Sequence, residues 1–252
     1  MDPTQRFTGR VTDYAKTRPS YPEGVLAVLA SACGLGASSV VADLGSGTGL
    51  FTQRLLESGA TVYAVEPNDE MRRAAEQALG SSRGFRSVAG RAEATTLDDA
   101  SVDVVTAAQA FHWFDLEPAR AEMKRILRAP GRVALVWNDR DLVSTAFLRD
   151  YEALLVARCP KYQELQGKAD ATAKFDALLG AGAWSRHVVP NAQRLDREGL
   201  ASRLLSSSYM PREGEPGHDE ILAELGAIFD RHAQAGEVAM LYATVIIAGS
   251  PA

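Results

Sequence analysis

The sequence predicts an α/β fold in which a mostly parallel, doubly wound sheet carries a helical cap. Between residues 20 and 140, short β-branched segments alternate with segments of helical length, which is the pattern of consecutive βαβ units. Right-handed crossovers between parallel strands then place helices on both faces of the sheet. After residue 140 the alternation stops, and long helical segments surround two further strands.

The expected strands follow from short apolar segments bounded by turn residues. They cover residues 40–42, 61–65, 85–89, 102–108, 132–138, 184–195 and 237–248. Pro190 either interrupts the sixth of these strands or confines it to a sheet edge, because proline has no amide hydrogen to donate. We expect one domain over residues 1–252, divided as follows: a cofactor-binding core over 36–140, cap insertions over 141–182 and 197–232, and closing strands over 183–196 and 237–249.

Composition excludes several classes of protein. With 46% hydrophobic and 23% charged residues in 252, the chain has the balance of an ordinary globular protein. A net charge of −5 argues against a general nucleic-acid surface. The two cysteines, Cys33 and Cys159, are far apart and predict neither a disulfide framework nor a metal site. No apolar run reaches about 18 residues and the first residues carry no secretory signal, so we expect a soluble cytoplasmic protein.

The strongest local feature is a glycine-rich turn between the first strand and the following helix. It reads Asp43-Leu44-Gly45-Ser46-Gly47-Thr48-Gly49. Glycine allows positive φ angles and close approach of a ligand to the backbone, and open α/β sheets bind ligands at this end of their strands. A dinucleotide fingerprint would need Gly or Ala where Leu50 stands, and a P-loop would need a lysine that is absent here.

An acidic residue, Glu66, follows the second strand, 17 positions beyond Gly49. A carboxylate at that place can accept hydrogen bonds from both hydroxyls of a ribose, which excludes a 2′-phosphate. The strand, glycine loop, helix, strand and acid together indicate a nucleoside-containing ligand, without distinguishing NAD from another adenosine.

Four motifs of this chain resemble those of class I S-adenosylmethionine-dependent methyltransferases. They are residues 43–49 (DLGSGTG), 65–71 (VEPNDEM), 90–93 (GRAE) with Leu97 and Asp103, and 128–133 (RAPGRV). The resemblance is greatest to the type 11 methyltransferase domain of small-molecule methyltransferases. Residues 14–22 and 109–114 are similar to its branch of trans-aconitate methyltransferase-like proteins. The resemblance implies a Rossmann-like sheet of seven strands with the last one antiparallel, and S-adenosylmethionine as cofactor.

The resemblance also implies roles for the residues of the core. The backbone of Gly45, Gly47 and Gly49 would pass under the methionine part of the cofactor, and Asp43 would orient this loop or the cofactor's ammonium group. The ribose and the adenine would be held by Glu66, Pro67, Met71, Ala92 and Glu93. Arg91 stands where an aspartate is common in the family, so a side-chain contact to the adenine amino group is not implied here.

The segment after the fourth strand would lie beside the reactive methyl group. Gln109 is expected to bind the cofactor's amino group or the acceptor, and Trp113 to form part of an aromatic wall around the sulfonium cation. His112 is the only histidine in the predicted cleft and is the candidate general base. Core packing at the start of a helix is the structural alternative for both His112 and Trp113.

The acceptor pocket is expected to receive residues from outside the core. Tyr14 and Arg18 precede the first strand and would fold over the cofactor as a lid. Asn138 and Arg140 follow the fifth strand, where an arginine would suit a carboxylate acceptor. Tyr209 lies between the last two strands and would line the pocket from the cap, unless it only packs the cap onto the core.

Methyl transfer to a small-molecule acceptor by in-line displacement is the leading hypothesis. A nicotinamide-dependent oxidoreductase and a non-catalytic S-adenosylmethionine-binding regulatory protein are the alternatives, because no residue is uniquely catalytic. A tRNA or protein methyltransferase is disfavoured by the acidic charge. We expect no metal, no nucleic acid and no membrane among the partners, and the oligomeric state stays open.

Overall fold

A seven-stranded sheet forms the centre of the protein in the computed structural model, which describes residues 18–162, 172–207 and 209–252. The strand order is β3-β2-β1-β4-β5-β7-β6. The strands are β1 Val40–Leu44, β2 Thr61–Val65, β3 Phe85–Val88, β4 Val102–Ala108, β5 Leu127–Arg140, β6 Trp184–Leu195 and β7 Val238–Gly249. Only β7 runs antiparallel to its neighbours, β5 and β6. The predicted sheet, mostly parallel with an antiparallel last strand, is therefore confirmed.

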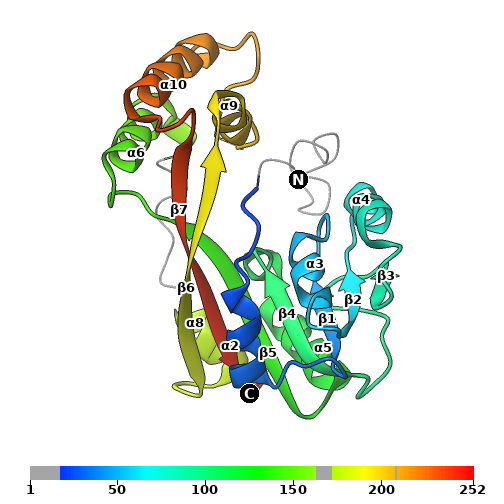
Figure 1. The fold of residues 1–252 in the computed structure, drawn as a ribbon. Helices are drawn as coiled ribbons and strands as arrows, with labels where there is room; N and C mark the ends of the chain where they lie inside the picture. The colour runs from blue at the N-terminus through cyan, green and yellow to red at the C-terminus, as the bar shows by residue number, and fades with distance from the viewer. Residues whose placement is uncertain (1–17, 163–171, 208) are drawn as a thin grey trace.

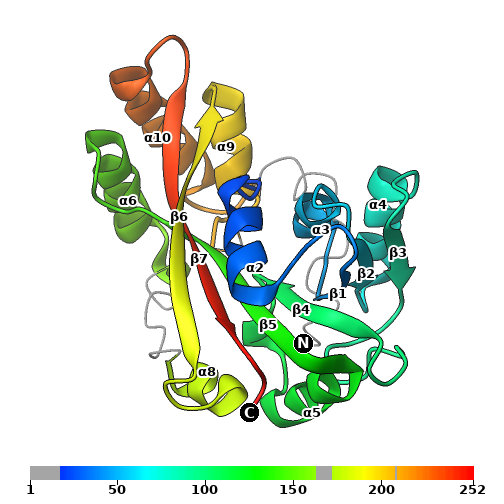
Figure 2. The same ribbon diagram turned by 60° about the horizontal axis from the view of Figure 1, so that its bottom comes forward.

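Helices cover both faces of this sheet (Figures 1 and 2). They are α2 Gly24–Cys33, α3 Leu50–Leu56, α4 Asp69–Leu79, α5 Leu116–Ile126 and α8 Thr172–Leu179. On one face α2 and α3 bury Leu29 and Leu55 against β1, β4, β5 and β7. On the other face α5 and α8 bury Met123 and Leu178 against the same strands. The burial of both faces explains why the parallel strands read as continuous apolar runs.

Local sequence explains why α4 begins where it does. The side chain of Asn68 accepts a hydrogen bond from the Met71 amide at 3.0 Å and so caps the first turn. Asp69 and Glu70 place negative charge at the positive end of the helix dipole. The buried residues of the helix, Met71, Ala75 and Leu79, recur every four positions, so α4 holds the loop after β2 against the sheet.

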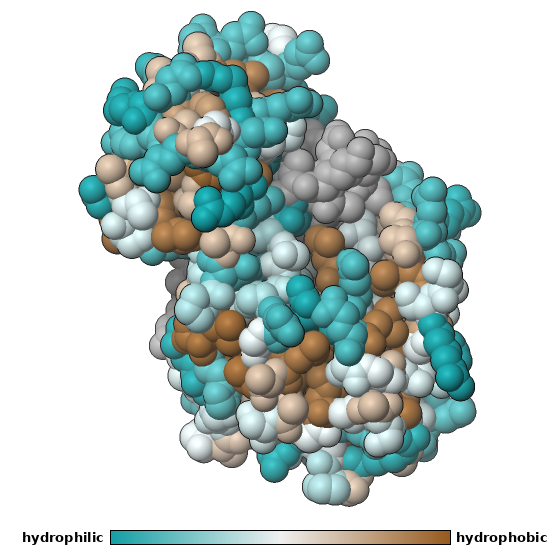
Figure 3. All heavy atoms as spheres, in the orientation of Figure 1, coloured by the Kyte–Doolittle hydropathy of each residue, from teal (hydrophilic) through white to brown (hydrophobic). Residues whose placement is uncertain are grey.

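The cap is built on the far ends of β6 and β7. Each strand has 12 residues, about 40 Å of extended chain, and the two pair along their whole length. Helices α6 Ala146–Arg158, α9 Arg197–Leu205 and α10 His218–His232 pack around their outer halves and enclose a separate apolar core. Figure 3 shows the cap as a rounded lobe with a mostly hydrophilic outer surface. Pro190 lies in β6, which is an edge strand of the sheet. An edge position suits proline because its missing amide hydrogen is not needed there for pairing with a further strand.

The predicted cap insertion 141–182 divides between the two lobes. Its first part contains α6 and belongs to the cap, whereas α8 packs on the sheet against α5 and β6. The ring of Phe175 lies between those of Phe111 and Trp184, at centroid distances of 6.3 and 5.6 Å. These aromatic contacts and the burial of the helix's apolar end explain why α8 covers the core.

Neither membrane spans nor metal clusters occur in the described part of the chain. In residues 18–162, 172–207 and 209–252, no helix combines the length and apolar character needed to cross a bilayer. In the same ranges, no three His, Cys, Asp or Glu side chains gather as a metal site would require.

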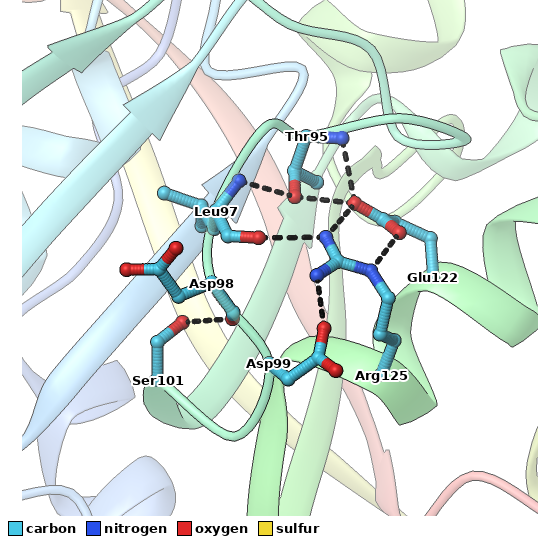
Figure 4. Close-up of polar contacts among 7 residues, drawn as sticks. All are labelled: Thr95, Leu97, Asp98, Asp99, Ser101, Glu122 and Arg125. Carbon is cyan, nitrogen blue, oxygen red and sulfur yellow. Dashed lines mark hydrogen bonds and ion pairs between the residues drawn. The ribbon is translucent and has the colours of Figure 1, made fainter.

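A buried acid on α5 anchors the loop that follows β3 (Figure 4). One carboxylate oxygen of Glu122 accepts hydrogen bonds from the amide and the hydroxyl of Thr95, at 2.7 and 2.5 Å. Arg125 donates to both oxygens of Glu122, and it also binds Asp99 and the Leu97 carbonyl. These hydrogen bonds, those of Arg125 above all, lower the pKa of Glu122 to about 2. The cluster thus holds the loop that continues from Ala92.

Replacing Glu122 with glutamine is expected to lower the free energy of unfolding by about 2–3 kcal/mol at neutral pH, because a buried charged hydrogen-bond acceptor is lost. The folded pKa of about 2 lies below the ordinary 4.5. The stabilisation is therefore complete above about pH 4.5 and is lost as the pH falls toward 2. Urea unfolding of both proteins between pH 7 and about pH 3.5 should show the difference narrowing over this range.

Glu117→Gln is the matched control on the same helix. Glu117 is exposed and pairs with Arg120 at 2.7 Å, so its removal should change the unfolding free energy by less than about 0.5 kcal/mol. A stability difference between wild type and Glu122→Gln that did not vary with pH would show that charge is not the source of the effect.

Candidate functional site

A cavity of about 900 Å³ lies at the carboxyl ends of the parallel strands, between the sheet and the cap. Residues after β1, β2, β3 and β4 form its sheet wall, and the end of α9 with the segment after it forms its cap wall. The predicted site residues that line it are Arg18, Asp43, Gly45, Gly47, Glu66, Pro67, Met71, Ala92, Glu93, Gln109, His112, Trp113 and Asn138. The structure thus brings most of the predicted site into one cavity at the switch point between β1 and β4.

The three glycines of the loop after β1 all have positive φ, but each is required for a different reason. A Cβ on Gly45 would lie 2.7 Å from the Cβ of Ala110, and one on Gly49 would lie 2.7 Å from Leu79 on α4. Gly47 is different, because its nearest neighbour would be the sulfur of Met71 at 3.9 Å. Gly45 and Gly49 therefore allow close packing of the backbone, and Gly49 does not line the cavity. Gly47 leaves space that a side chain would fill.

Asp43 is the penultimate residue of β1 and is almost completely buried. Its two oxygens accept hydrogen bonds from the hydroxyls of Thr52 on α3 and Thr106 on β4, at 2.7 and 2.8 Å. Burial raises the pKa of Asp43 to about 6, against the effect of these two hydrogen bonds. The carboxylate therefore ties β1, just before the glycine loop, to α3 and β4, and its role in orienting the loop or the cofactor stays a prediction.

Glu66 connects the glycine loop to the turn after β2. One oxygen accepts a hydrogen bond from the Gly47 amide at 2.9 Å, and the other accepts one from the Asn68 amide at 2.8 Å. Burial raises the pKa of Glu66, and the two amides and Arg72 oppose that rise. A carboxylate has about four acceptor positions, so two remain available for donors such as the hydroxyls of a ribose. The cavity beside Gly47 and this acid fit a nucleoside.

Flat apolar surface lies next to Glu66. Met71 and Ala92 are buried, and together with Pro67 they line the cavity. The side chain of Glu93 accepts a hydrogen bond from the Asp115 amide at 2.9 Å, so the loop after β3 is tied to the start of α5. Thin, apolar walls with polar groups at one edge suit an aromatic base, and the polarizable sulfur of Met71 suits its face.

Gln109 follows β4 with an unusual backbone conformation. Its φ is 55°, a left-handed angle that costs a non-glycine residue free energy and that clusters at functional sites. Its amide donates to the Val136 carbonyl at 2.8 Å, and its side-chain nitrogen donates to the Asn138 carbonyl at 3.3 Å. β5 therefore holds Gln109 at the cavity wall.

His112 and Trp113 lie on a single 3-10 turn, Phe111–Trp113, directly after Gln109. Their rings are 4.7 Å apart, and Trp113 is 38% exposed although it lines the cavity. Phe111 instead points into the core against Trp137, at a centroid distance of 6.4 Å. Phe111 therefore packs in the core, whereas His112 and Trp113, for which core packing was the structural alternative, line the cavity.

The residues expected around the acceptor divide into two groups. Asn138 lines the cavity, but its oxygen accepts from Thr244 at 2.6 Å and from Asn191 at 3.2 Å, and its nitrogen approaches the Ser20 carbonyl at 3.4 Å. It therefore pins the chain just after Arg18, which also lines the cavity. Tyr14 lies outside the described residues.

The structure does not bring Arg140 or Tyr209 to the cavity. Arg140 donates to Glu152 at 2.5 Å and to the Tyr162 hydroxyl at 2.7 Å, inside the cap. Tyr209 packs edge-on against Tyr162 at 4.9 Å. β5 continues beyond its pairing with β4 and stays paired with β7 as far as Arg140. The Arg140 side chain therefore enters the cap core, where Glu152 neutralises its charge.

Sequence analysis expected the segment around Tyr209 to line the pocket from the cap, and Ser206 and Met210 of that segment do lie in the cap wall. It missed the other residues of this wall, which include Ser202, Arg203, Arg212, Glu213 and Tyr242. One signal was available in the sequence: Arg203 lies next to Leu204 in the apolar stripe of α9, where a charged residue is unusual.

Comparison with known proteins identifies the core. Residues 42–135 match the family profile described as a methyltransferase domain. Over 142 residues the chain is 45% identical to an uncharacterized methyltransferase of Mycobacterium tuberculosis, which is 56% of this chain and 55% of that one. It is 38% identical over 139 residues to an uncharacterized methyltransferase-like protein of Schizosaccharomyces pombe, covering 54% and 52%. The chain spans about half the length of the curated relatives it matches.

Solved structures extend the likeness to the whole fold. A protein assigned as a type II methyltransferase from Anaeromyxobacter dehalogenans has a TM-score of 0.68 at 22% identity, over 92% of this chain and 97% of that one. A methyltransferase assigned to an antibiotic biosynthesis pathway in Anabaena variabilis has a TM-score of 0.60 at 22% identity, over 92% and 98%. Residues 42–135 therefore belong to a methyltransferase domain of type 11, for which S-adenosylmethionine is the cofactor, and the two solved structures share the fold of this chain.

Proposed function

We propose that the protein transfers a methyl group from S-adenosylmethionine to a small-molecule acceptor held between the glycine loop and the cap. The observation that carries this proposal is the buried Glu66 carboxylate, which binds the Gly47 amide beside a cavity of about 900 Å³. Cavities of this order enclose a drug-sized ligand. The cap wall gives the acceptor a surface that is separate from the groups assigned to the cofactor.

The sheet wall binds and orients the cofactor in this proposal. Glu66 accepts hydrogen bonds from the ribose hydroxyls, and Met71 and Ala92 border the adenine. Asp43 holds the loop whose backbone passes under the methionine part. These contacts fix the position and orientation of the cofactor. They thereby fix the direction from which an acceptor attacks, and this alignment is the main contribution that a protein makes to such a displacement.

When bound, S-adenosylmethionine supplies an electrophilic methyl group on a positively charged sulfur. The face of Trp113 suits a cation, and the ring beside it, His112, excludes water from the same wall. Gln109, held by β5, positions its amide at the end of β4. His112 takes the proton from a phenol or amine acceptor, whereas an ionised carboxylate acceptor needs no base.

Replacing Glu66 with glutamine is expected to weaken binding of S-adenosylhomocysteine by about 1.5–3 kcal/mol, or roughly ten- to hundredfold, because charged hydrogen bonds to the ribose are lost. Calorimetric titration measures this change, and a thermal melt establishes that the variant is folded. NAD, which shares the ribose, is titrated in parallel as the competing ligand.

Glu213→Gln is the control, because Glu213 lines the same cavity from the cap wall. It should leave the affinity for S-adenosylhomocysteine unchanged. An unchanged affinity in folded Glu66→Gln, or tighter binding of NAD than of S-adenosylhomocysteine by the wild type, would refute the assignment.

Gly47→Val is expected to weaken binding of S-adenosylhomocysteine by at least about tenfold, since the added side chain enters the space beside Met71. The matched control is Gly34→Val. Gly34 also has a positive φ, 71°, and has no neighbour within 4 Å of a built Cβ, so both variants carry similar backbone strain. Equal affinities of the two variants, measured by calorimetry, would place the cofactor away from the glycine loop.

A further inference from the structure

The cap wall of the cavity contains an arginine that pairs with no carboxylate among the described residues. Arg203, on α9, lines the cavity, and its Nε atom is shielded from solvent and has no hydrogen-bond partner in the described part of the chain. Its Nη1 donates to the Ser207 hydroxyl at 3.4 Å. Within the part of the chain that the structure describes, no carboxylate lies within ion-pair distance of this guanidinium, although 13 other arginine–carboxylate contacts are formed.

The groups around Arg203 are neutral. Those that act on it electrostatically are the hydroxyls of Tyr242, Tyr151 and Tyr209. Tyr242 is itself buried and lines the cavity beside Arg203, and it donates to Gln193 at 3.3 Å. Tyrosine hydroxyls can accept a hydrogen bond from the guanidinium, but they do not neutralise its charge.

Arg140 provides the comparison within the same cap. Both guanidinium groups are shielded from solvent and both lie near Tyr151, but Arg140 is paired with Glu152 at 2.5 Å. Buried charges are normally paired, because removing an ion from water costs several kcal/mol. Arg140 satisfies this rule within the chain, and Arg203, at the cavity wall, does not.

We propose that Arg203 forms a subsite for a carboxylate group of the acceptor. The proposal rests on the function proposed above and narrows its acceptor to an anionic small molecule. A guanidinium presents Nε–H and Nη–H donors in one plane, which matches the two oxygens of a carboxylate. Arg212 and Glu213, on the same wall, add one positive and one negative charge, while Asp43, Glu66 and Glu93 lie on the sheet wall.

Binding of matched neutral and anionic probes tests this subsite. The full chain, saturated with S-adenosylhomocysteine, is titrated with succinate and benzoate, with their amides succinamide and benzamide, and with inorganic phosphate. We expect a carboxylate to bind at millimolar concentration and its amide not to bind. Arg203→Gln should weaken the carboxylate at least about tenfold, and Arg203→Lys, which keeps the charge, should retain more of the binding than Arg203→Gln.

Arg197→Gln controls for loss of a positive charge on the same helix. Arg197 is exposed, pairs with Asp230 and does not line the cavity. This variant should bind the carboxylate as the wild type does. Thermal melts verify that all three variants are folded, and rescue by lysine separates charge recognition from a merely structural role of Arg203.

Binding of two cofactor analogues tests whether Arg203 recognises the carboxylate of the acceptor or that of the cofactor. S-adenosylhomocysteine carries an amino-acid carboxylate, whereas 5′-methylthioadenosine lacks it. We expect Arg203→Gln to bind both as the wild type does. If it loses only S-adenosylhomocysteine, Arg203 serves the cofactor and the proposal is overturned.

Three other results would also overturn the proposal. They are equal carboxylate binding by wild type and Arg203→Gln, equal binding of carboxylates and amides by the wild type, and stronger binding of phosphate than of any carboxylate. Failure of the wild type to bind S-adenosylhomocysteine would instead refute the proposed function. In that case, selective carboxylate binding by the protein alone would still support the subsite.

Discussion

Two buried carboxylates under the glycine loop, Asp43 and Glu66, determine the shape of the site. Asp43 joins the end of β1 to α3 and β4, and Glu66 joins the loop to the turn after β2. Both have a raised pKa because they are buried, and the charge of Glu66 adds to the rise at Asp43. Hydrogen bonds from hydroxyls and amides offset the free-energy cost of burying these two carboxylates. They also leave acceptor positions on Glu66 for a ligand.

The lengths of β6 and β7 explain how a second lobe can form one wall of the cavity. The two strands stay paired with each other beyond the ends of the shorter parallel strands. The cap helices build their own apolar core around this extension. Since α9 and the segment after it face the glycine loop across the cavity, the cap can vary its wall without disturbing the cofactor loops. This division agrees with the general placement of specificity in insertions on α/β folds.

Charge is distributed unequally across the cavity. The sheet wall contributes the acids Asp43 and Glu66, which accept hydrogen bonds from hydroxyls or backbone amides. The cap wall contributes Arg203, which pairs with no carboxylate among the described residues, together with Arg212 and the acid Glu213. Arg140, which pairs with Glu152, shows that the same cap neutralises a guanidinium that does not line this cavity. The contrast between the two arginines distinguishes a structural ion pair from a candidate recognition group.

The sequence alone determined the sheet, the glycine loop and the position of Glu66, because these depend on patterns within one strand–turn–helix unit and on the spacing between consecutive strands. It also placed Gln109, His112 and Trp113 at the end of β4. Only the tertiary structure determined which residues form the cap wall of the cavity. Whether Arg140 or Arg203 faces the cavity depends on how far β5 extends and on which carboxylate lies across the cap core, and such contacts form between different elements of the fold. The same reason applies to α8, whose place on the sheet follows from aromatic partners on three other elements.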